Sequence, residues 1–340
     1  MKYMIYGAGS LGIILSAYLS KNGEAFDIVD RNPKSIEALN NNGAKVVGKV
    51  EFSAPVHAVL DTEVKEKYDI IFMLSKQIGN KETVLKLSKM LTKEGVICTL
   101  QNGLPEKDVA EVIGEKRTFG AAVGWGATRL APGVSELTSE PERECLTFSF
   151  GSYDGHKDKY YAEIVRILSI MGNVELEENF IGARWVKLLI NSAFSGMSAV
   201  CGDTFGAVAK RKDSRRVIQR IIKECIDVAS SANIKIEKIQ GKDVVKLLDY
   251  KNGFKKWLSF VIIPLAIKKH SALKASMLQD LEKGRPCEID SINGVVVQFG
   301  KEYNVPVPFN EKVVEIVKKC ETGELKPSFE NVKLFDELLK

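Results

Sequence analysis

The sequence predicts an α/β N-terminal domain with a doubly wound parallel sheet, followed by an all-α helical domain. Short apolar runs alternate with helical periods over the first half of the 340-residue chain, which is typical of βαβ units. A glycine-rich turn joins the first strand to the first helix. From Ile181 onward, the period is helical almost throughout. We therefore expect a dinucleotide-binding domain at residues 1–178 and a helical substrate and catalytic domain at 179–340.

Two sets of segments carry this prediction. The expected strands span residues 2–6, 25–29, 68–74, 95–100, 118–123, 134–138, 146–150 and 172–176, with a β-rich stretch at 44–59. The expected helices span residues 11–22, 33–41, 81–91, 160–171, 182–200, 214–232, 243–249, 257–270, 276–283, 289–303 and 311–320. The continuous apolar run at 68–74 favours the middle of the sheet. Alternating residues at 134–138 and 146–150 predict an antiparallel pair that finishes it.

The first turn has the pattern G-x-G-x-x-G, at Gly7, Gly9 and Gly12, between a strand and a helix. Gly7 makes the tight turn, Gly9 lets the backbone approach a pyrophosphate, and Gly12 lets the helix pack close to the strand. The N-terminus of the helix offers N–H groups and a positive dipole end to the phosphates. This pattern predicts a Rossmann-type dinucleotide site.

Polar residues follow three predicted strands. Asp30 lies 30 − 12 = 18 residues beyond Gly12, close to the spacing of about 20 at which a carboxylate meets the adenosine ribose. Lys76 and Asn102 come directly after later strands. Ligands of such sheets bind beyond the carboxyl ends of the strands, so we expect both residues at the crevice of the glycine loop. The alternatives are a surface lysine and a turn asparagine.

Composition excludes several classes of protein. Lys and Arg number 49 against 44 Asp and Glu, and the charges are scattered, so neither nucleic acid nor a membrane is expected as a partner. The six cysteines lie far apart without histidine partners, which predicts reduced thiols, no metal site and a cytoplasmic protein. A strand beginning at residue 2 leaves no room for a signal peptide. The apolar stretch Trp257–Ile267 is too short to span a bilayer and predicts a buried or interface helix.

Three polar residues recur at four-residue spacing in the apolar helix predicted at 182–200. Lys187, Asn191 and Ser195 therefore share one face. A lysine there is costly to bury without a partner or a role. The alternative is that these residues form the solvent side of an amphipathic helix. Glu288, expected to open a helix, and Ser276, expected to be an N-cap, are further candidates with equally ordinary alternatives.

Together these segments resemble the ketopantoate reductase (2-dehydropantoate 2-reductase) family across nearly the whole chain. The matching motifs, in the order of the family, are Gly7-Ala-Gly-Ser-Leu-Gly12, Lys76, Gln101-Asn-Gly103, Trp185-Val-Lys-Leu-Leu-Ile-Asn191, Ser276-Met-Leu-Gln-Asp280, Glu288-Ile-Asp-Ser-Ile-Asn-Gly294, and Val305-Pro-Val-Pro308 with Asn310. The resemblance implies hydride transfer from a reduced nicotinamide to the C2 carbonyl of a 2-oxo acid, in the synthesis of pantothenate.

The resemblance also implies a role for each residue. Lys187 is the general acid, and Glu288 pairs with it and engages the hydroxyl end of the substrate. The expected substrate-binding residues are Asn102, Asn191, Ser195 and Ser276. The expected cofactor-binding residues are Gly7, Ala8, Gly9, Ser10, Leu11, Gly12, Asp30, Arg31, Lys76, Asn102 and Glu288.

Several positions depart from the family pattern. Ser195 and Leu273 stand where the family usually has asparagines of the substrate cleft, which leaves open a different branched 2-oxo acid as the substrate. The family uses NADPH, with an arginine, here Arg31, on the 2′-phosphate. Asp30 precedes it and favours NADH or relaxed specificity. The Trp257–Ile267 stretch either reshapes the cleft or is buried in a homodimer. A β-hydroxyacid dehydrogenase and a non-catalytic nucleotide sensor are the remaining alternatives.

Overall fold

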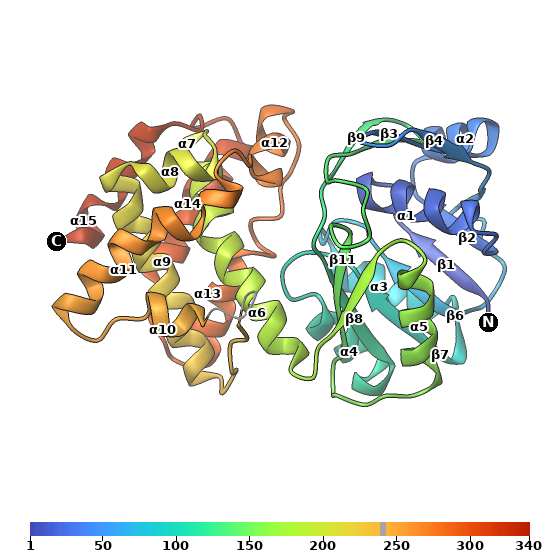
Figure 1. Cartoon of the computed structure of the whole chain (residues 1–340), viewed down its shortest axis with the longest axis horizontal. Helices are drawn as coiled ribbons and strands as arrows, with labels where there is room; N and C mark the ends of the chain where they lie inside the picture. The colour runs from blue at the N-terminus through green and yellow to red at the C-terminus, as the bar shows by residue number, and fades with distance from the viewer. Residues whose placement is uncertain (239–242) are drawn as a thin grey trace. The chain divides into compact units, whose positions relative to one another are not determined.

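The structure of the protein, a computed structural model, describes residues 1–238 and 243–340. The chain divides into two compact units, Met1–Phe180 and Ile181–Lys340. Figure 1 shows strands and helices in the first unit and helices in the second. The roles predicted for the two domains remain predictions.

The first unit is built on one large sheet. Its strands are β1 (Tyr3–Tyr6), β2 (Phe26–Asp30), β5 (His57–Leu60), β6 (Tyr68–Met73), β7 (Leu91–Thr99), β8 (Thr118–Val123), β11 (Thr147–Ser152) and β12 (Asn173–Leu176). In the described part of the chain they follow the order β12-β11-β8-β7-β6-β1-β2-β5. Neighbouring strands are parallel except β11 and β8. The apolar run at 68–74 is indeed an inner strand, β6, between β7 and β1.

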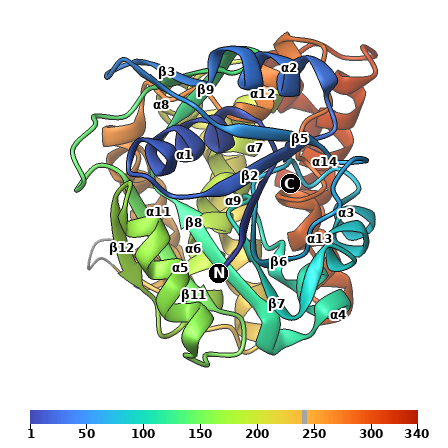
Figure 2. The same ribbon diagram turned by 90° about the vertical axis from the view of Figure 1, so that its right-hand side faces the viewer.

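Helices cover both faces of this sheet. They are α1 (Ser10–Lys21), α2 (Pro33–Asn42), α3 (Asn80–Ser88), α4 (Glu106–Ile113) and α5 (Lys159–Ser169), with the 3₁₀ turn η1 (Glu115–Arg117). Side chains alternate along β1, so Tyr3 and Ile5 join the core under α1 and α5, while Met4 and Tyr6 join the core under α3 and α4. Figure 2 shows these two pairs of helices on opposite sides of the strands. This arrangement confirms the predicted doubly wound fold.

A second sheet corrects one prediction. Its strands are β3 (Ala44–Gly48), β4 (Phe52–Ala54), β9 (Ala127–Ala131) and β10 (Val134–Leu137). The antiparallel pair predicted between residues 134–138 and 146–150 is wrong, because β10 pairs with β9 and β3 whereas β11 pairs with β8 and β12. Alternation of apolar residues identifies a strand with one buried face, but it does not identify the partner strand.

Two glycines of the large sheet make room for an aromatic ring. Gly120 on β8 pairs with Gly151 on β11. A Cβ added at Gly120 would lie 2.5 Å from Cζ of Phe180, and one at Gly151 would lie 2.6 Å from its Cβ. Phe180 is buried. The last residue of the first unit therefore fills a glycine-lined depression on its own sheet.

The second unit is helical, as predicted. Its elements are α6 (Phe180–Ile190), which begins at the last residue of the first unit, the π-helical turn η2 (Asn191–Ser195), α7 (Gly196–Cys201), α8 (Phe205–Lys210), α9 (Lys212–Ser231), α10 (Val244–Leu248), α11 (Gly253–Ala266), η3 (Lys268–His270), α12 (Ser276–Glu282), α13 (Asn293–Glu302), α14 (Pro308–Glu321), η4 (Phe329–Phe335) and α15 (Asp336–Leu339). The single helix predicted at 182–200 is therefore interrupted by η2. A single π-helical turn changes the spacing of apolar residues too little to be predicted from the sequence.

Residues 257–266 of the apolar stretch lie in α11, and Ile267 follows directly after this helix. Trp257 is 60% exposed and Leu265 is 68% exposed, so the prediction that this stretch is buried within the chain is wrong for these side chains. Its burial in an interface stays a prediction. Among residues 1–238 and 243–340, no helix combines the length and apolarity that a membrane crossing requires.

A buried glutamate closes the N-terminus of α14. Glu224, on α9, is 8% exposed. Its Oε1 accepts the Phe309 N–H at 2.9 Å and its Oε2 accepts the Asn310 N–H at 2.9 Å. These are N–H groups that a helix leaves without an internal partner at its start. Burial raises the pKa of Glu224 to about 7, although these hydrogen bonds act in the opposite direction.

We expect Glu224 to make stability depend on pH. Its pKa is higher in the folded chain than the 4.5 of an ordinary glutamate, so its stabilising contribution is complete below pH 4.5 and is lost as pH rises through 7. Relative to Glu224→Gln, the wild type should lose roughly 2–4 kcal/mol of unfolding free energy between pH 4.5 and 8. Urea denaturation followed by circular dichroism measures this. The exposed Glu337→Gln is the control, and a pH-independent difference between Glu224→Gln and wild type would contradict the expectation.

Candidate active site

The glycine loop has the geometry that a dinucleotide requires. Gly7 has φ +112°, and a Cβ there would lie 2.7 Å from the Ser75 nitrogen. A Cβ at Gly12 would overlap the Gly7 carbonyl oxygen, whereas one at Gly9 would meet no atom within 4 Å. At Gly7 and Gly12, other backbone atoms of the protein lie too close for a side chain. Beside Gly9, at the N-terminus of α1, the space is open. This space fits a pyrophosphate held by backbone N–H groups.

Asp30 is bound to this loop. Its Oδ2 accepts the Ala8 N–H at 2.7 Å, and its Oδ1 accepts the Asn32 N–H at 2.8 Å. Asp30 is half-buried, while Arg31 beside it is exposed. The carboxylate therefore fixes the turn of the glycine loop as well as placing a negative charge at the end of β2. Its contact with the loop is a feature that sequence reasoning did not predict.

The loops after β6 and β7 meet at the same edge of the sheet as the glycine loop, because β1, β6 and β7 are parallel neighbours. The exposed Lys76 and the half-buried Asn102 lie on these two loops, where the sequence predicted them. The Gln77 side chain donates to the Asn102 carbonyl. Like the glycine loop, Asp30 and Arg31, both loops belong to the first unit, and the remaining candidate residues of the site belong to the second unit.

A buried glutamine joins these two loops. Gln101 Nε2 donates to the Ser75 carbonyl at 2.7 Å and to Asn80 Oδ1 at 3.0 Å, and its Oε1 accepts from Thr99 at 2.9 Å. Sequence reasoning missed the role of Gln101 and Asn80 in supporting the site. The triplet at residues 101–103 could have indicated this role, but only its asparagine was predicted to belong to the site.

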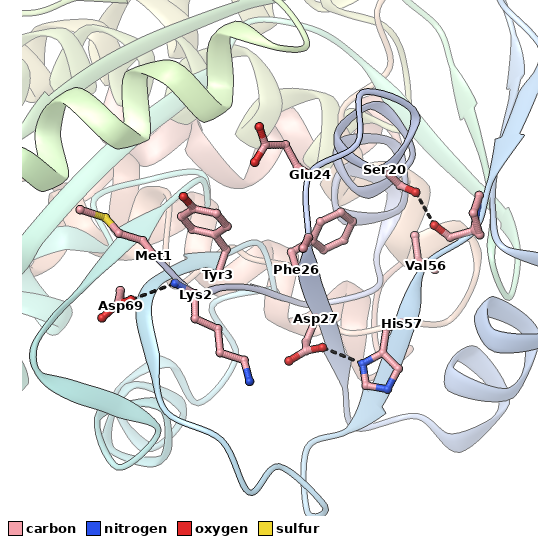
Figure 3. A pocket seen from close by; sticks show the side chains of 12 residues that line it. Met1, Lys2, Tyr3, Ser20, Glu24, Phe26, Asp27, Val56, His57 and Asp69 are labelled. Carbon is pink, nitrogen blue, oxygen red and sulfur yellow. Dashed lines mark hydrogen bonds and ion pairs between the residues drawn. The ribbon is translucent and has the colours of Figure 1, made fainter.

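A cavity of about 800 Å³ lies elsewhere on the first unit (Figure 3). Tyr3 and Phe26, which line it, are the first residues of β1 and β2, so it opens at the amino ends of the strands. His57 Nδ1 lies 2.6 Å from Asp27 Oδ1, and Figure 3 shows the two side chains facing each other. This cavity is at the opposite edge of the sheet from the glycine loop and is distinct from the nucleotide site.

In the second unit, the three polar residues that the sequence places on one face lie on α6 and η2. Lys187 and Asn191 are half-buried, and Ser195 is 6% exposed. The Ser195 hydroxyl donates to Asn191 Oδ1 at 3.4 Å. These residues therefore do not form a freely solvated stripe, which weakens the alternative of an ordinary amphipathic helix.

Ser276 lies on α12, which contacts η2 and α7, and Glu288 lies between α12 and α13. Ser276 is exposed and is the first residue of α12; the preceding Ala275 N–H donates to the α7 side chain Ser198 at 3.4 Å. Ser276 makes no side-chain cap, so the N-cap alternative is wrong. Glu288 is half-buried and lies in turns five residues before α13, so it does not open that helix as predicted. Backbone bonds from residues 291, 292 and 294 close these turns instead.

Comparison with known proteins identifies the family. Two family models, described as "Ketopantoate reductase PanE/ApbA" and "Ketopantoate reductase PanE/ApbA C terminal", match residues 3–145 and 179–321. The chain belongs to the ketopantoate reductase family. This confirms the resemblance and favours a ketopantoate reductase over the β-hydroxyacid dehydrogenase and the non-catalytic nucleotide sensor that the sequence left open.

Relatives of the ketopantoate reductase family align along the full length. The 2-dehydropantoate 2-reductase of Pyrococcus abyssi (strain GE5 / Orsay) is 26% identical over 328 residues, covering 95% of this chain and 99% of the relative. That of Aquifex aeolicus (strain VF5) is 28% identical over 331 residues, covering 96% and 99%.

Solved structures share the ketopantoate reductase fold. D-mandelate dehydrogenase with NADH and anilino(oxo)acetate has a TM-score of 0.79 at 20% identity, covering 95% of this chain and 99% of that one. The 2-dehydropantoate 2-reductase from Geobacter metallireducens GS-15 has a TM-score of 0.75 at 24% identity, covering 94% and 99%. At these identities the likeness shows the fold.

Proposed function

We propose that this protein reduces the C2 carbonyl of ketopantoate to the alcohol of pantoate, with NADPH or NADH as the reductant. The observation that carries the proposal is the match of both family models, together with a half-buried lysine and asparagine in a mostly buried helical segment. The pathway is then the synthesis of pantothenate. Among the residues that the structure describes, no group of three or more His, Cys, Asp and Glu side chains could hold a metal ion.

In the proposed mechanism, Lys187 protonates the carbonyl oxygen as negative charge develops on it. An ammonium group aimed at this oxygen supplies both a proton and electrostatic stabilisation. Asn191 and Ser195 orient the substrate, Ser276 binds its carboxylate, and Glu288 holds the lysine and the hydroxyl end of the substrate. The reduced nicotinamide supplies the hydride when it is bound.

The glycine loop would hold the cofactor through the residues predicted from the sequence. The open space beside Gly9 and the N-terminus of α1 support pyrophosphate binding there. Lys76 and Asn102 would contact the cofactor and the substrate from the neighbouring loops. Asp30 favours a ribose 2′-OH over a 2′-phosphate, so we expect NADH to be used as well as or better than NADPH.

The test is the loss of absorbance at 340 nm with purified protein, ketopantoate and each of the two cofactors. Efficient turnover supports the proposed function. Binding of the cofactor without turnover of ketopantoate would overturn it, and other branched 2-oxo acids would then be tried, because Ser195 and Leu273 replace family amides. Size-exclusion chromatography with light scattering tests the predicted homodimer, which a monomer would contradict.

We expect Asp30→Asn to shift cofactor preference. The variant removes the negative charge and keeps one oxygen to accept a backbone N–H of the loop. The ratio of kcat/KM for NADPH to that for NADH should rise about tenfold, as loss of ~1.4 kcal/mol of charge repulsion gives. Steady-state kinetics with both cofactors measure it. Arg31→Ala should move the ratio the other way, and an unchanged ratio in Asp30→Asn would show that Asp30 serves the loop alone.

A further inference from the structure

The turn that carries Asn191 and Ser195 is π-helical. The Gly196 N–H bonds to the Asn191 carbonyl five residues before it. This turn therefore contains one residue more than a turn of an α-helix. Since each residue of an α-helix advances the chain by about 100°, removing this extra residue from the turn would rotate one end of the helix relative to the other. Because Asn191 begins the turn and Ser195 ends it, the alignment of Ser195 with Lys187 and Asn191 depends on the turn.

A side chain from another helix supports this turn. Asn293, the first residue of α13, is fully buried, and its Nδ2 donates to the Ser192 carbonyl at 3.0 Å. Ser192 lies inside the π-helical turn. The hydrogen bond therefore gives a carbonyl of the π-helical turn a partner from outside the helix. Side chains inserted in this way accompany other interruptions of the α-helical hydrogen-bond pattern.

Two further buried groups fix the orientation of the Asn293 amide. Its Nδ2 also donates to Asn310 Oδ1 at 2.9 Å, and Asn310 Nδ2 donates to Glu224 Oε2 at 2.7 Å. Two backbone N–H groups already donate to the Glu224 carboxyl group. Because these oxygens act as acceptors, Asn310 must turn its NH₂ group toward Glu224 and its oxygen toward Asn293. Asn293 must then turn its own NH₂ group toward Ser192.

A glycine keeps this arrangement tight. A Cβ added at Gly196, directly after the turn, would lie 2.8 Å from Asn293 Oδ1 and 3.0 Å from Val313 Cγ1. Among the residues that the structure describes, no donor bonds to that oxygen. A side chain at residue 196 would therefore displace the Asn293 amide.

We propose that Glu224, Asn310 and Asn293 form a hydrogen-bond relay that positions the catalytic helix, by holding the π-helical turn that sets Ser195 beside Asn191 and Lys187. None of the three contacts the substrate in this proposal; they are positioning residues, and the inference rests on the proposed function. It extends the site from the face of one helix into the polar core behind it.

The test compares Asn293→Ala with Asn331→Ala. Asn331 is also buried and donates to a carbonyl of the same helix, Val200 at 3.0 Å, but beyond the turn. Asn293→Ala should lower kcat/KM for the 2-oxo acid at least tenfold and leave the KM for the cofactor within twofold. Asn331→Ala should leave both within twofold, at a similar loss of stability. Equal kinetic losses in the two variants would overturn the proposal.

A double-mutant cycle separates positioning from general loosening. In a Ser195→Ala background, the effect of Asn293→Ala on kcat/KM should shrink to less than threefold, because the group that it positions is gone. Full additivity of the two losses would overturn the proposal. Gly196→Ala, which displaces the amide without removing a hydrogen-bonding group, should reproduce the kinetic loss of Asn293→Ala.

A crystal structure of Asn293→Ala tests the relay without any substrate. We expect the Gly196 N–H to bond to the Ser192 carbonyl as in an α-helix, with loss of the Ser195–Asn191 contact. An unchanged π-helical turn would overturn the relay even if the wild type is active. If the wild type reduced no 2-oxo acid, the proposed function would fail, and this structure would still decide whether the relay holds the turn.

Discussion

Replacing Lys187 by alanine should lower kcat/KM for ketopantoate by about 10²–10⁴-fold, the range that loss of a general acid produces. The proton for the new alcohol must then come from water, and the developing negative charge loses its nearest cation. KM for the cofactor should change less than threefold, because Lys187 is placed on the helical unit and not on the glycine loop. Steady-state kinetics at 340 nm with saturating cofactor measure the effect.

Lys187→Arg distinguishes proton transfer from charge alone. Arginine keeps the positive charge but does not release a proton in this pH range, so most of the loss should remain. Lys301→Ala, which removes an exposed lysine of α13, is the matched control and should leave activity unchanged. If Lys187→Ala retained a third or more of the wild-type kcat/KM, Lys187 would not be the general acid.

Replacing Gly12 by alanine should damage both nucleotide binding and the fold of the first unit. The added Cβ would overlap the Gly7 carbonyl oxygen, a backbone atom that can move only if the loop moves. Such overpacking costs about 1–3 kcal/mol. We expect NADPH and NADH to bind about 5- to 140-fold more weakly, since a tenfold change in affinity corresponds to about 1.4 kcal/mol. Isothermal titration calorimetry and urea denaturation measure the two effects.

Gly9→Ala separates the two contributions. Its Cβ meets no atom of the fold within 4 Å, so stability should be kept while the cofactor meets a methyl group in its phosphate space. Gly253→Ala, also in open space but at the start of α11, should change neither quantity. Wild-type affinity in Gly12→Ala would contradict the assignment of this loop to the nucleotide.

The sequence was most informative where the determinants are local. The strand, glycine turn and helix at residues 2–22 lie where the pattern predicts them, because turn sterics and helical periodicity are properties of adjacent residues. The pairing of β10 with β3 was not predictable in this way. It joins β3, far earlier in the chain, and only the three-dimensional fold brings these strands together.

The polar core behind the candidate site escaped prediction for a related reason. Glu224 lies on an amphipathic helix rich in charged residues, where a glutamate usually faces solvent. Its partners Phe309 and Asn310 are supplied by a helix more than 80 residues later. Only the Asn310 and Asn293 positions were visible, as parts of family motifs, and their spacing did not reveal that they touch each other.

The depression over Gly120 and Gly151 determines where the first unit can be cut. A fragment ending at residue 178, the predicted domain boundary, would lack the Phe180 ring that fills this depression. It would uncover the two glycines of β8 and β11 and leave the Glu106 carboxylate beside Gly120 without the ring that packs there. A fragment for separate expression should therefore extend through Phe180, even though this residue already begins the helix of the second unit.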